Sequence, residues 1–555
     1  MSVADNYTFS SSLEQDENNF IFDTKQYVYV PDSNNTSYSG GQIRFDATAL
    51  SNSGKLFDSN QSFITIPLVL QMAVGTGACA DALENAFCLS LKNGYHQLIN
   101  SISVELGNNQ IVNITNFSNL DINYQLLSSM SGDTLKTFGS SLGFCPDTHT
   151  SIRHAPAASI YGVGECNNVI DDVAFNSADG YGGTKLAVNE GRYNRMTDTS
   201  FDSTAASILY KSIDTARLNN VAKNYVTRAD GIINYHILAT IPLRILHPIF
   251  QKLPLMRNSY FRIILNTNCQ SSSVVTVETV ATVKVFNSYT STTQNGTLPF
   301  MISPCAGGFV PTTDGTFKLP LGIGKSLDGA TSNPFFTQCR LYACLYTFSP
   351  MAEQRYFSQS KKKVLYNDIL SYQILNVGAG ANINELITNG ISRPRYMLIY
   401  PFLSSLANGV QIITSVAGGL GSPMGSPFSS APATCSPFCF LTNFNVMVSG
   451  SNVFQSNINY NFENFLQQWR QGNSLNGGMT DNMSSGLIDK NAWAGGYNVV
   501  YVDLSKKISQ AADDVSRAIQ ITGTNGSLVS VDYYIILSYE RELLLSTSTG
   551  NLIFE

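Results

Sequence analysis

The first candidate for chemistry is a glycine-containing stretch that could hold a dinucleotide. In TIPLVLQMAVGTGACADALENAF, Gly75 and Gly77 follow a strand-like run, as they would in a dinucleotide-binding turn. That turn requires a surrounding βαβ unit and an acidic residue about 20 positions later on a second parallel strand. The strand that follows here is amphipathic and bounded by turns. We therefore favour a tight turn between two strands of a β-sandwich.

A second stretch, LPLGIGKS at residues 319–326, ends like a phosphate-binding loop. In the motif G-x-x-x-x-G-K-[ST], the first glycine starts the backbone cradle that surrounds the phosphates. Leu319 occupies that position here, so the cradle lacks its starting glycine. We predict a surface loop at this place and no nucleotide-binding site.

Two Cys and two His lie close together in the sequence and have the side chains that zinc prefers. They are Cys145, His149, His154 and Cys166. The two His are separated by four residues, as in structural zinc sites, but such sites also hold their Cys as close pairs. Because the two Cys are single and far apart, we expect no metal site.

Residues for acid–base or nucleophilic catalysis are scarce. The chain has five His and no G-x-S-x-G motif for an activated serine. The acidic pairs Asp171–Asp172 and Asp513–Asp514 are adjacent in sequence, so on a strand their side chains would face opposite sides of the sheet. Cys435 and Cys439 have no partner pair and are expected to be small apolar fillers. We predict no catalytic residue, no cofactor and no enzymatic activity.

The distribution of charge argues against nucleic-acid binding. The formal net charge is −6, whereas a protein held by phosphate contacts needs a basic stripe or arm. The amino-terminal residues are acidic and polar. The basic run Lys361–Lys363 is interpreted as a solvated loop or as the guard of an edge strand. Sequence-specific binding of nucleic acid is not expected.

The composition favours an all-β protein. Charged residues make up 13% of the chain, about half the usual share, while it contains 27 Tyr and 31 Phe. Aromatic and uncharged polar residues suit half-buried β surfaces, whereas solvated helices usually carry Glu and Lys. A weakly charged surface also suits a protein that is covered by copies of itself, because burying ionised groups is costly.

No segment of the sequence has the pattern of a membrane anchor. The longest apolar runs, 62–70 and 232–250, are too short or are interrupted by residues such as Pro242 and Arg244. We therefore expect a soluble chain without a transmembrane segment. The ten Cys, in a sequence without a recognisable signal peptide, are expected to be reduced thiols and not a disulfide framework.

Strand-like segments recur along the whole chain. The alternation over residues 42–47 places Ile43, Phe45 and Ala47 on one face of a strand. Further strands are expected at 26–30, 62–72, 100–106, 233–241, 259–266, 273–286, 338–348, 362–376, 395–403, 442–449, 497–504, 516–522 and 528–546. Helical patterns do not alternate with these strands, so a parallel βαβ architecture is not expected.

Two amphipathic helices are expected among the strands. The segment SNLDINYQLLSSM begins at a possible Ser118 cap and places Ile122, Leu126 and Met130 at helical spacing. The segment NYNFENFLQQWRQG does the same and ends at Gly472. Its apolar residues are Phe462, Phe465, Leu466 and Trp469, for which we expect a role in the core.

Two large β domains would account for the 555 residues. Each half contains a comparable set of strands, a helix and a long loop. We place the boundary near residue 290, which gives an N-terminal domain at 1–290 and a C-terminal domain at 291–555. The long insertions are expected around 145–232 in the first domain and around 404–438, rich in Gly, Ser and Pro, in the second.

Several segments resemble the major capsid proteins of polinton-like viruses, which are related to those of virophages and belong to the double jelly-roll lineage. In the first half these segments are YSGGQIRFDATALSNSGKLFD, ITIPLVL, IPLRILHPIFQKLPLMRNSYFRIILNTN and NGTLPFMISP. In the second half they are CRLYACLYTFSP, LITNGISRPRYMLIYPFL, SPMGSPFSSAPATCSPF, SLNGGMTDNMSSGLID and VDYYIILSYERELLLSTSTG. The resemblance runs in order over nearly the whole chain and contains no catalytic signature.

The resemblance implies two tandem eight-stranded antiparallel jelly rolls with long loop insertions and a few short helices. It also implies homotrimeric, pseudo-hexameric capsomers that tile the icosahedral capsid of a double-stranded DNA virus. The partners would then be further copies of the chain, a single jelly-roll penton protein and minor capsid proteins. The location would be the virion, after synthesis and assembly inside the host cell. In this setting Arg393 and Arg395, which flank Pro394, would stiffen the start of a strand and pair across an interface.

Other functions fit the sequence less well. A β-rich adhesin or glycan-binding surface protein would share the strands, the aromatic residues and the Asn/Ser-rich loops, but it would normally carry a secretion signal or a membrane anchor. An enzyme on a β scaffold, such as a polysaccharide lyase, should present a cluster of Asp, Glu, His or Lys. A minor capsid or vertex protein usually needs one jelly roll, and the length of this chain favours the major protein.

Overall fold

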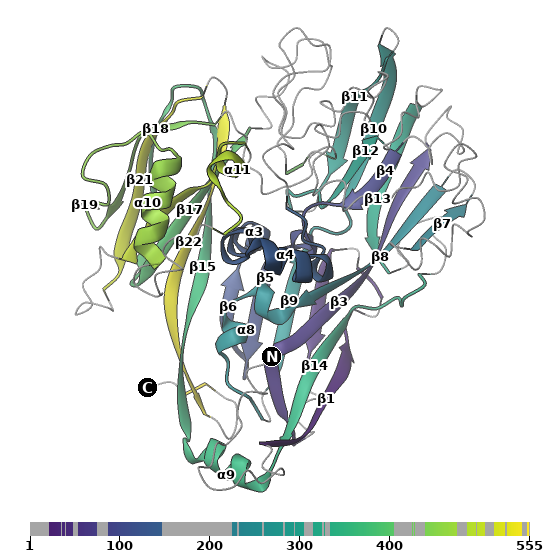
Figure 1. Cartoon of the computed structure of the whole chain (residues 1–555), viewed down its shortest axis with the longest axis vertical. Coiled ribbons are helices and arrows are strands. Elements are labelled where there is room, and N and C mark those ends of the chain that lie inside the picture. Colours follow the sequence, from purple (N-terminus) through teal and green to yellow (C-terminus); the bar gives the residue numbers. More distant parts are fainter. Residues whose placement is uncertain are drawn as a thin grey trace.

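The chain folds into two β bodies that lie side by side. The computed structural model describes residues 21–553 except for several gaps. The longer gaps cover 48–53, 75–86, 147–224, 305–314, 405–423, 428–438, 474–485 and 506–514. Figure 1 shows the two bodies joined at the lower end of the view by α9 (Pro350–Ser358). The strands before α9 form the N-terminal body, and the strands after it form the C-terminal body.

The C-terminal body consists of two four-stranded sheets, with strand orders β15-β22-β17-β20 and β16-β21-β18-β19. Its first strand therefore pairs with its last, and its second with the one before last. This is the order of an antiparallel ribbon folded over on itself, which is a jelly roll. The strands are β15 (Lys361–Val377), β16 (Asn382–Ile391), β17 (Pro394–Leu403), β18 (Leu441–Val448), β19 (Ser451–Asn452), β20 (Val500–Asp503), β21 (Arg517–Asn525) and β22 (Val531–Ser546).

The N-terminal body contains the same strand order. One sheet includes the run β1-β14-β3 with β8 paired to β3, and the other has the order β2-β9-β5-β6. Again the first strand of the ribbon pairs with the last and the second with the one before last. These strands are β1 (Phe22–Pro31), β2 (Gln42–Asp46), β3 (Leu56–Val74), β5 (Ile99–Leu106), β6 (Asn109–Ile114), β8 (Ile232–Pro242), β9 (Phe261–Thr267) and β14 (Arg340–Phe348).

Further strands are inserted into this N-terminal roll. Four of them lie between β9 and β14, and three of these extend the main sheet through the pairing of β13 with β3. The inserted strands are β4 (Phe87–Leu91), β7 (Tyr225–Ala229), β10 (Ser272–Val280), β11 (Val283–Thr292), β12 (Phe300–Pro304) and β13 (Gly315–Ile323). The N-terminal body is thus larger than a simple roll.

The strand pairing favours another domain boundary than the one expected near residue 290. The insertion β10–β13 separates the last strand of the N-terminal roll from the rest of that roll, and this last strand is β14 at Arg340–Phe348. Because β14 pairs with β1 and β3, the N-terminal body extends to α9. We propose a boundary within α9. Most of the expected insertions at 145–232 and 404–438 lies outside the described residues.

Helices lie mainly between the two bodies and at their ends. They are η2 (Tyr95–Leu98), α3 (Ser118–Ser129), α4 (Gly132–Phe138), η3 (Ser140–Leu142), α7 (Leu243–Leu246), α8 (Ile249–Lys252), α10 (Phe462–Asn473) and α11 (Lys490–Gly495). Both expected helices are present as α3 and α10. The expected cap is wrong, because the N-cap of α3 is Phe117 in the left-handed conformation, and the Ser118 hydroxyl donates to the Ile99 carbonyl instead.

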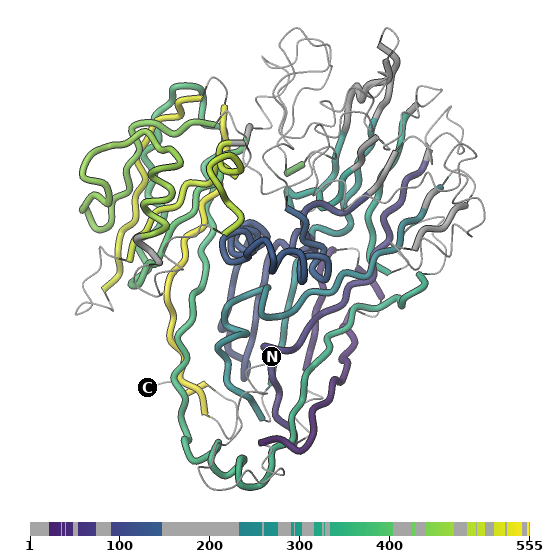
Figure 2. The backbone as a smooth tube through the Cα atoms, in the orientation of Figure 1, coloured from purple at the N-terminus to yellow at the C-terminus, as the bar shows by residue number. Residues whose placement is uncertain are grey.

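Residues alternate along the strands between buried and more exposed positions, and this alternation builds the sheets and their core. Ile43 and Phe45 of β2 are fully buried, as the sequence predicts, and β9 alternates between buried and half-buried residues along its length. Burying the apolar face of each strand in this way is the main source of stability for such sheets. Most of the buried apolar side chains of both bodies form one connected cluster, and Leu56, Cys344 and Tyr346 form a smaller one. Figure 2 shows the last strand, β22, running beside β15 down toward the linking helix.

Candidate functional site

The stretch that resembles a phosphate-binding loop is a buried strand. Residues 319–323 belong to β13, and Leu319 and Leu321 are almost fully buried. The predicted surface loop is therefore wrong for this part, because the alternating apolar residues pair with β3 and β10. The stretch around Gly75 and Gly77 lies outside the described residues, so its turn stays a prediction.

The residues considered for zinc are not brought together by the part of the chain that the structure describes. Cys145 is half-buried, and His149, His154 and Cys166 lie in the gap at 147–224. Within the described ranges, no group of three His, Cys, Asp or Glu residues is placed to hold a metal ion. Cys439 is buried, as expected for a small apolar filler. Cys435 and both acidic pairs, 171–172 and 513–514, lie outside the described residues.

The basic run at Lys361–Lys363 begins the edge strand β15, as one of the two interpretations predicts. Lys363 Nζ lies 2.6 Å from Glu542 Oε1 on the neighbouring strand β22. Lys362 lies over the ring of Tyr356, and burial lowers the pKa of its ammonium group to about 8. These lysines contact the protein itself along the sheet edge, where charge discourages pairing with another strand.

The two arginines around Pro394 also pair within the chain. Pro394 begins β17, and Arg393 Nη1 lies 3.5 Å from Glu540 Oε1 on β22. Arg395 forms an ion pair with the same carboxylate. Both ion pairs lie inside one sheet, between the neighbouring strands β17 and β22, so pairing across an interface stays a prediction.

The aromatic helix α10 packs against the core, as expected. Phe465 is almost fully buried, and Trp469 makes edge-on contacts with Tyr124 of α3 and Tyr501 of β20. Because Tyr124 belongs to the N-terminal body and Trp469 to the C-terminal body, this aromatic contact joins the two. The interface between the bodies also contains a network of polar side chains.

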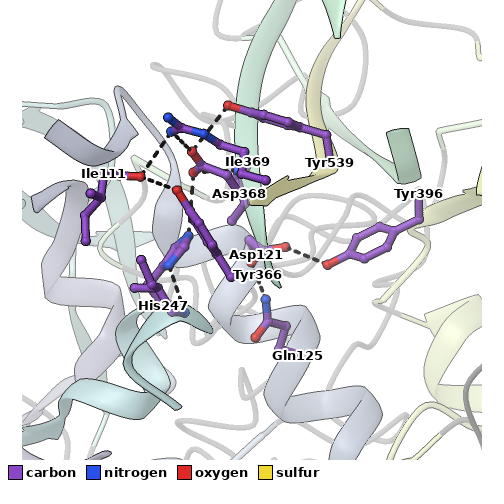
Figure 3. A network of polar contacts seen from close by, with 11 residues as sticks. Ile111, Asp121, Gln125, His247, Tyr366, Asp368, Ile369, Tyr396 and Tyr539 are labelled. Carbon is purple, nitrogen blue, oxygen red and sulfur yellow. Dashed lines mark hydrogen bonds and ion pairs between the residues drawn. The ribbon is translucent and has the colours of Figure 1, made fainter. Parts of the chain in front are cut away.

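Asp368 of β15 is the centre of a polar network at this interface (Figure 3). Its carboxylate accepts a hydrogen bond of 2.8 Å from Arg541 Nη1 and one of 3.3 Å from the Tyr539 hydroxyl. The backbone N–H of Ile369 donates to the other oxygen at 2.9 Å. His247, from the segment between α7 and α8, places Nε2 3.6 Å from Asp368 Oδ1. That distance is beyond a hydrogen bond and leaves an electrostatic attraction.

The same network reaches the backbone of the N-terminal body. Arg541 Nη1 and the Tyr366 hydroxyl both donate to the carbonyl oxygen of Ile111 in β6, at 3.0 Å and 2.5 Å. A backbone carbonyl has two lone pairs, so Ile111 can accept both bonds. Residues of β15 and β22 are thereby fixed to the edge strand of the opposite body.

The electrostatics of Asp368 favour its charged form. Burial alone would raise the pKa of this carboxyl, but His247, Arg541 and the backbone N–H of Ile369 outweigh it, and the pKa lies below the usual value. His247 Nδ1 accepts the N–H of Ile249, which assigns the ring proton to Nε2, facing Asp368. The charge is thus satisfied by partners from both bodies, which a buried carboxylate requires.

Asp121 of α3 marks a second, less polar contact in the same interface. Its carboxyl is almost fully buried and accepts a 2.6 Å hydrogen bond from Gln125 Nε2. The Tyr396 hydroxyl of β17 lies 3.4 Å away, across the interface. The Tyr400 hydroxyl donates to the Leu120 carbonyl at 2.9 Å. Burial raises the pKa of Asp121 to about 7, because no cation faces it to offset the desolvation.

We expect the stability of the protein to depend on pH through Asp121. The pKa of this group is higher in the folded state than its ordinary value of 3.8, so its contribution favours folding below about pH 4 and is lost as the pH rises through about 7. Asp121→Asn removes this dependence. Urea unfolding from pH 4 to 8 should show the variant gaining stability relative to wild type up to about pH 7. A difference that stays constant over this range would contradict the raised pKa.

A third contact joins the end of α3 to the chain before α11. The N–H of Leu487 donates to the Leu127 carbonyl at 2.7 Å, and Gly486 lies directly against the last turn of α3. The three contacts together fasten the bodies through polar groups whose partners lie within the chain. This arrangement suits rigid positioning of the two bodies relative to each other.

Sequence reasoning missed this interface. In β15, Val364, Tyr366 and Asp368 share a buried face, while Leu365 on the opposite face is 43% exposed. An acidic residue on the apolar face of a strand whose other face exposes a leucine is a signal for a buried polar contact. The partner His247 is far away in the sequence, so the signal does not identify it.

The comparisons with known proteins concern the fold. No protein-family model matches the sequence, and no curated protein matches it either. A chain in the cryo-EM structure of the Sputnik virophage matches with a TM-score of 0.51 and 13% identity, over 96% of this chain and 88% of that one. The chain has a double jelly-roll fold.

Two further structures are similar to this double jelly roll at lower scores. The Faustovirus major capsid protein matches with a TM-score of 0.44 and 10% identity, over 94% of this chain and 90% of that one. The mavirus major capsid protein matches with a TM-score of 0.40 and 9% identity, over 98% and 94%. Within the described ranges, none of the helices has the length and hydropathy to cross a bilayer.

Proposed function

We propose that this chain is a major structural protein of an icosahedral viral capsid. The observation that carries the proposal is the presence of two jelly rolls with the same strand order, side by side in one chain. Three such chains around a threefold axis present six similar bodies, which is the outline of a pseudo-hexamer. The likeness in fold to a chain of the Sputnik virophage and the sequence resemblance to polinton-like capsid proteins support the same function.

An exposed aromatic edge supports assembly with further copies. The strand β1 lies at the edge of its sheet, and Tyr27 and Tyr29 are 48% and 55% exposed. Their rings continue a row formed by Phe63 and Tyr342, which stack at 4.8 Å. Free strand edges and exposed Tyr clusters are typical of surfaces that become buried on association.

In this proposal the protein has a structural and not an enzymatic role. The double-stranded DNA lies inside the shell, and the chain does not recognise its sequence. A single jelly-roll penton protein and minor capsid proteins complete the virion, which is assembled in the host cell. The low charge of the chain supports a surface that is covered by its own copies.

Negative-stain microscopy and native mass spectrometry of the purified full chain test the proposal. We expect hexagonal particles with the mass of three chains. Tyr27→Asp combined with Tyr29→Asp should shift the mass toward one chain while the circular-dichroism spectrum of the fold is kept, because it places charge on a surface that is buried on association. The control pair Tyr27→Phe and Tyr29→Phe should keep the trimer. A wild-type monomer that binds sugars would refute the capsid proposal and favour a glycan-binding protein.

A further inference from the structure

A groove in the N-terminal body has the size and lining of a small-molecule site. It encloses about 370 Å³ between α3, α4 and η3 on one side and α7 and α8 on the other. Pockets for small ligands usually start at about 300 Å³ and combine an apolar wall with a few polar groups. The groove shares Gln125 with the interface between the bodies and otherwise lies apart from it.

The apolar wall of the groove is one face of α3. Ile122, Leu126 and Met130 follow each other at a spacing of one helical turn and line the groove, backed by Leu142. At the rim, Phe138 of α4 is 57% exposed, which is unusual for a large apolar side chain. Ile122, Leu126 and Met130 are 2%, 7% and 8% exposed, so a hydrocarbon chain along this face would gain mainly by covering the exposed Phe138 ring.

Arg244 is the one charged residue in the lining. The other polar residues there are the neutral Gln125, Ser129, Thr134, Ser141 and Gln251. The Arg244 side chain is exposed and, within the described ranges, has no ion-pair partner. Gln251 Nε2 donates to the Arg244 carbonyl at 2.9 Å, which ties the backbone of α7 to α8 and fixes where the guanidinium starts.

We propose that the groove binds a small amphiphile with one carboxylate head group and a medium-length hydrocarbon chain. The carboxylate pairs with the Arg244 guanidinium, whose planar fork matches two carboxylate oxygens. The hydrocarbon lies along Ile122, Leu126 and Met130. Charge complementarity decides the head group, since a lone arginine at the groove repels a cation and leaves a neutral alcohol without an ionic partner. A helical peptide would need a longer groove than this volume provides.

Calorimetric titration of the full chain with three ligands of equal chain length tests this proposal. The ligands are dodecanoate and dodecyltrimethylammonium, each below its micelle concentration, and dodecanol below its solubility limit. We expect dodecanoate to bind up to about fivefold more tightly than the other two, because this is the most that an ion pair with an exposed arginine contributes. Arg244→Gln should weaken dodecanoate by the same factor and remove the preference. The control Lys252→Gln changes an exposed cation on α8 outside the lining and should leave binding within about twofold of wild type.

A second variant tests the position of the hydrocarbon. Ser129→Trp fills the groove from the exposed end of α3 and should abolish binding of dodecanoate while the melting temperature is kept. Equal affinity for the anionic and cationic amphiphiles, or equal losses in Arg244→Gln and Lys252→Gln, would overturn the proposal. Binding of an acidic amphipathic peptide without binding of dodecanoate would also overturn it and would identify a protein-docking groove. None of these outcomes depends on capsid assembly.

Discussion

Asp368→Ala should lower the free energy of unfolding by about 3 kcal/mol at neutral pH, because it breaks a buried charge network by removing one partner. The Asp368 side chain is 2% exposed, and the substitution leaves Arg541, Tyr539 and His247 without their common acceptor. Arg541 is 36% exposed and can partly turn to water, which places the expected loss at the lower end of the range for buried pairs.

The expected loss also has a pH dependence. The folded-state pKa of Asp368 is lowered, so its contribution is complete above the unfolded pKa of about 4 and disappears as the pH falls through the folded value. Urea unfolding at a fixed protein concentration measures the difference, since self-association would otherwise add to stability.

Glu542→Ala is the matched control for this prediction. Glu542 lies on β22 close to the same network and pairs with Lys363 and Arg393, but its side chain is 38% exposed. Ion pairs of this exposure contribute less than about 1 kcal/mol. If the two variants lose equal stability, the network around Asp368 does not hold the bodies together in the way inferred here.

The sequence predicts the strands better than their assignment to domains. The alternation of apolar and polar residues identifies β2 and β9, because each strand buries one face. This two-residue period can be recognised from the local sequence alone. The inserted strands β10–β13 have the same β pattern as the rolls themselves, so nothing local marks them as an insertion. A boundary after β14 therefore stays a proposal that strand pairing, and not composition, supports.

The lack of typical turn residues explains another difference between the predicted and the observed strands. The sequence predicts one strand over residues 273–286, whereas β10 and β11 are two strands that pair antiparallel, with Val280 opposite Val283. The two residues between them in the sequence, Ala and Thr, are not Gly, Asn, Asp or Pro, which are the usual signs of a turn. The edge strand β16 was missed for a related reason, because its sequence NINELITNGI is rich in Asn and exposes Leu386.

The interface between the bodies is beyond sequence reasoning because its partners come from distant segments. His247, Asp368 and Arg541 meet only after both rolls have formed. Each residue alone has an ordinary explanation, as a loop histidine or as a charge on a strand. By contrast, the apolar residues of α3 were predicted at their observed spacing, because one helix face contains all of them.

Gly486→Ala should destabilise the contact between the bodies by about 3 kcal/mol, through a forbidden backbone conformation and a steric clash together. Gly486 has a φ of +68°, and a Cβ there would lie 2.3 Å from the Leu127 carbonyl oxygen and 2.5 Å from that of Ser128. Both oxygens belong to the backbone of α3, which cannot move aside as a flexible side chain would. The segment must therefore detach or α3 must shift.

Gly450→Ala separates the two causes of this loss. Gly450 has a φ of +81° in the turn after β18, but a Cβ there would meet nothing within 4 Å. Gly450→Ala should lower the free energy of unfolding by about 1–2 kcal/mol, which is the cost of the left-handed conformation alone. Hydrogen exchange at the Leu487 amide should become faster in Gly486→Ala and stay unchanged in Gly450→Ala, because the hydrogen bond to Leu127 depends on the close approach. Equal losses in both variants, with Leu487 still protected, would mean that the approach of Gly486 to α3 does not help to join the two rolls.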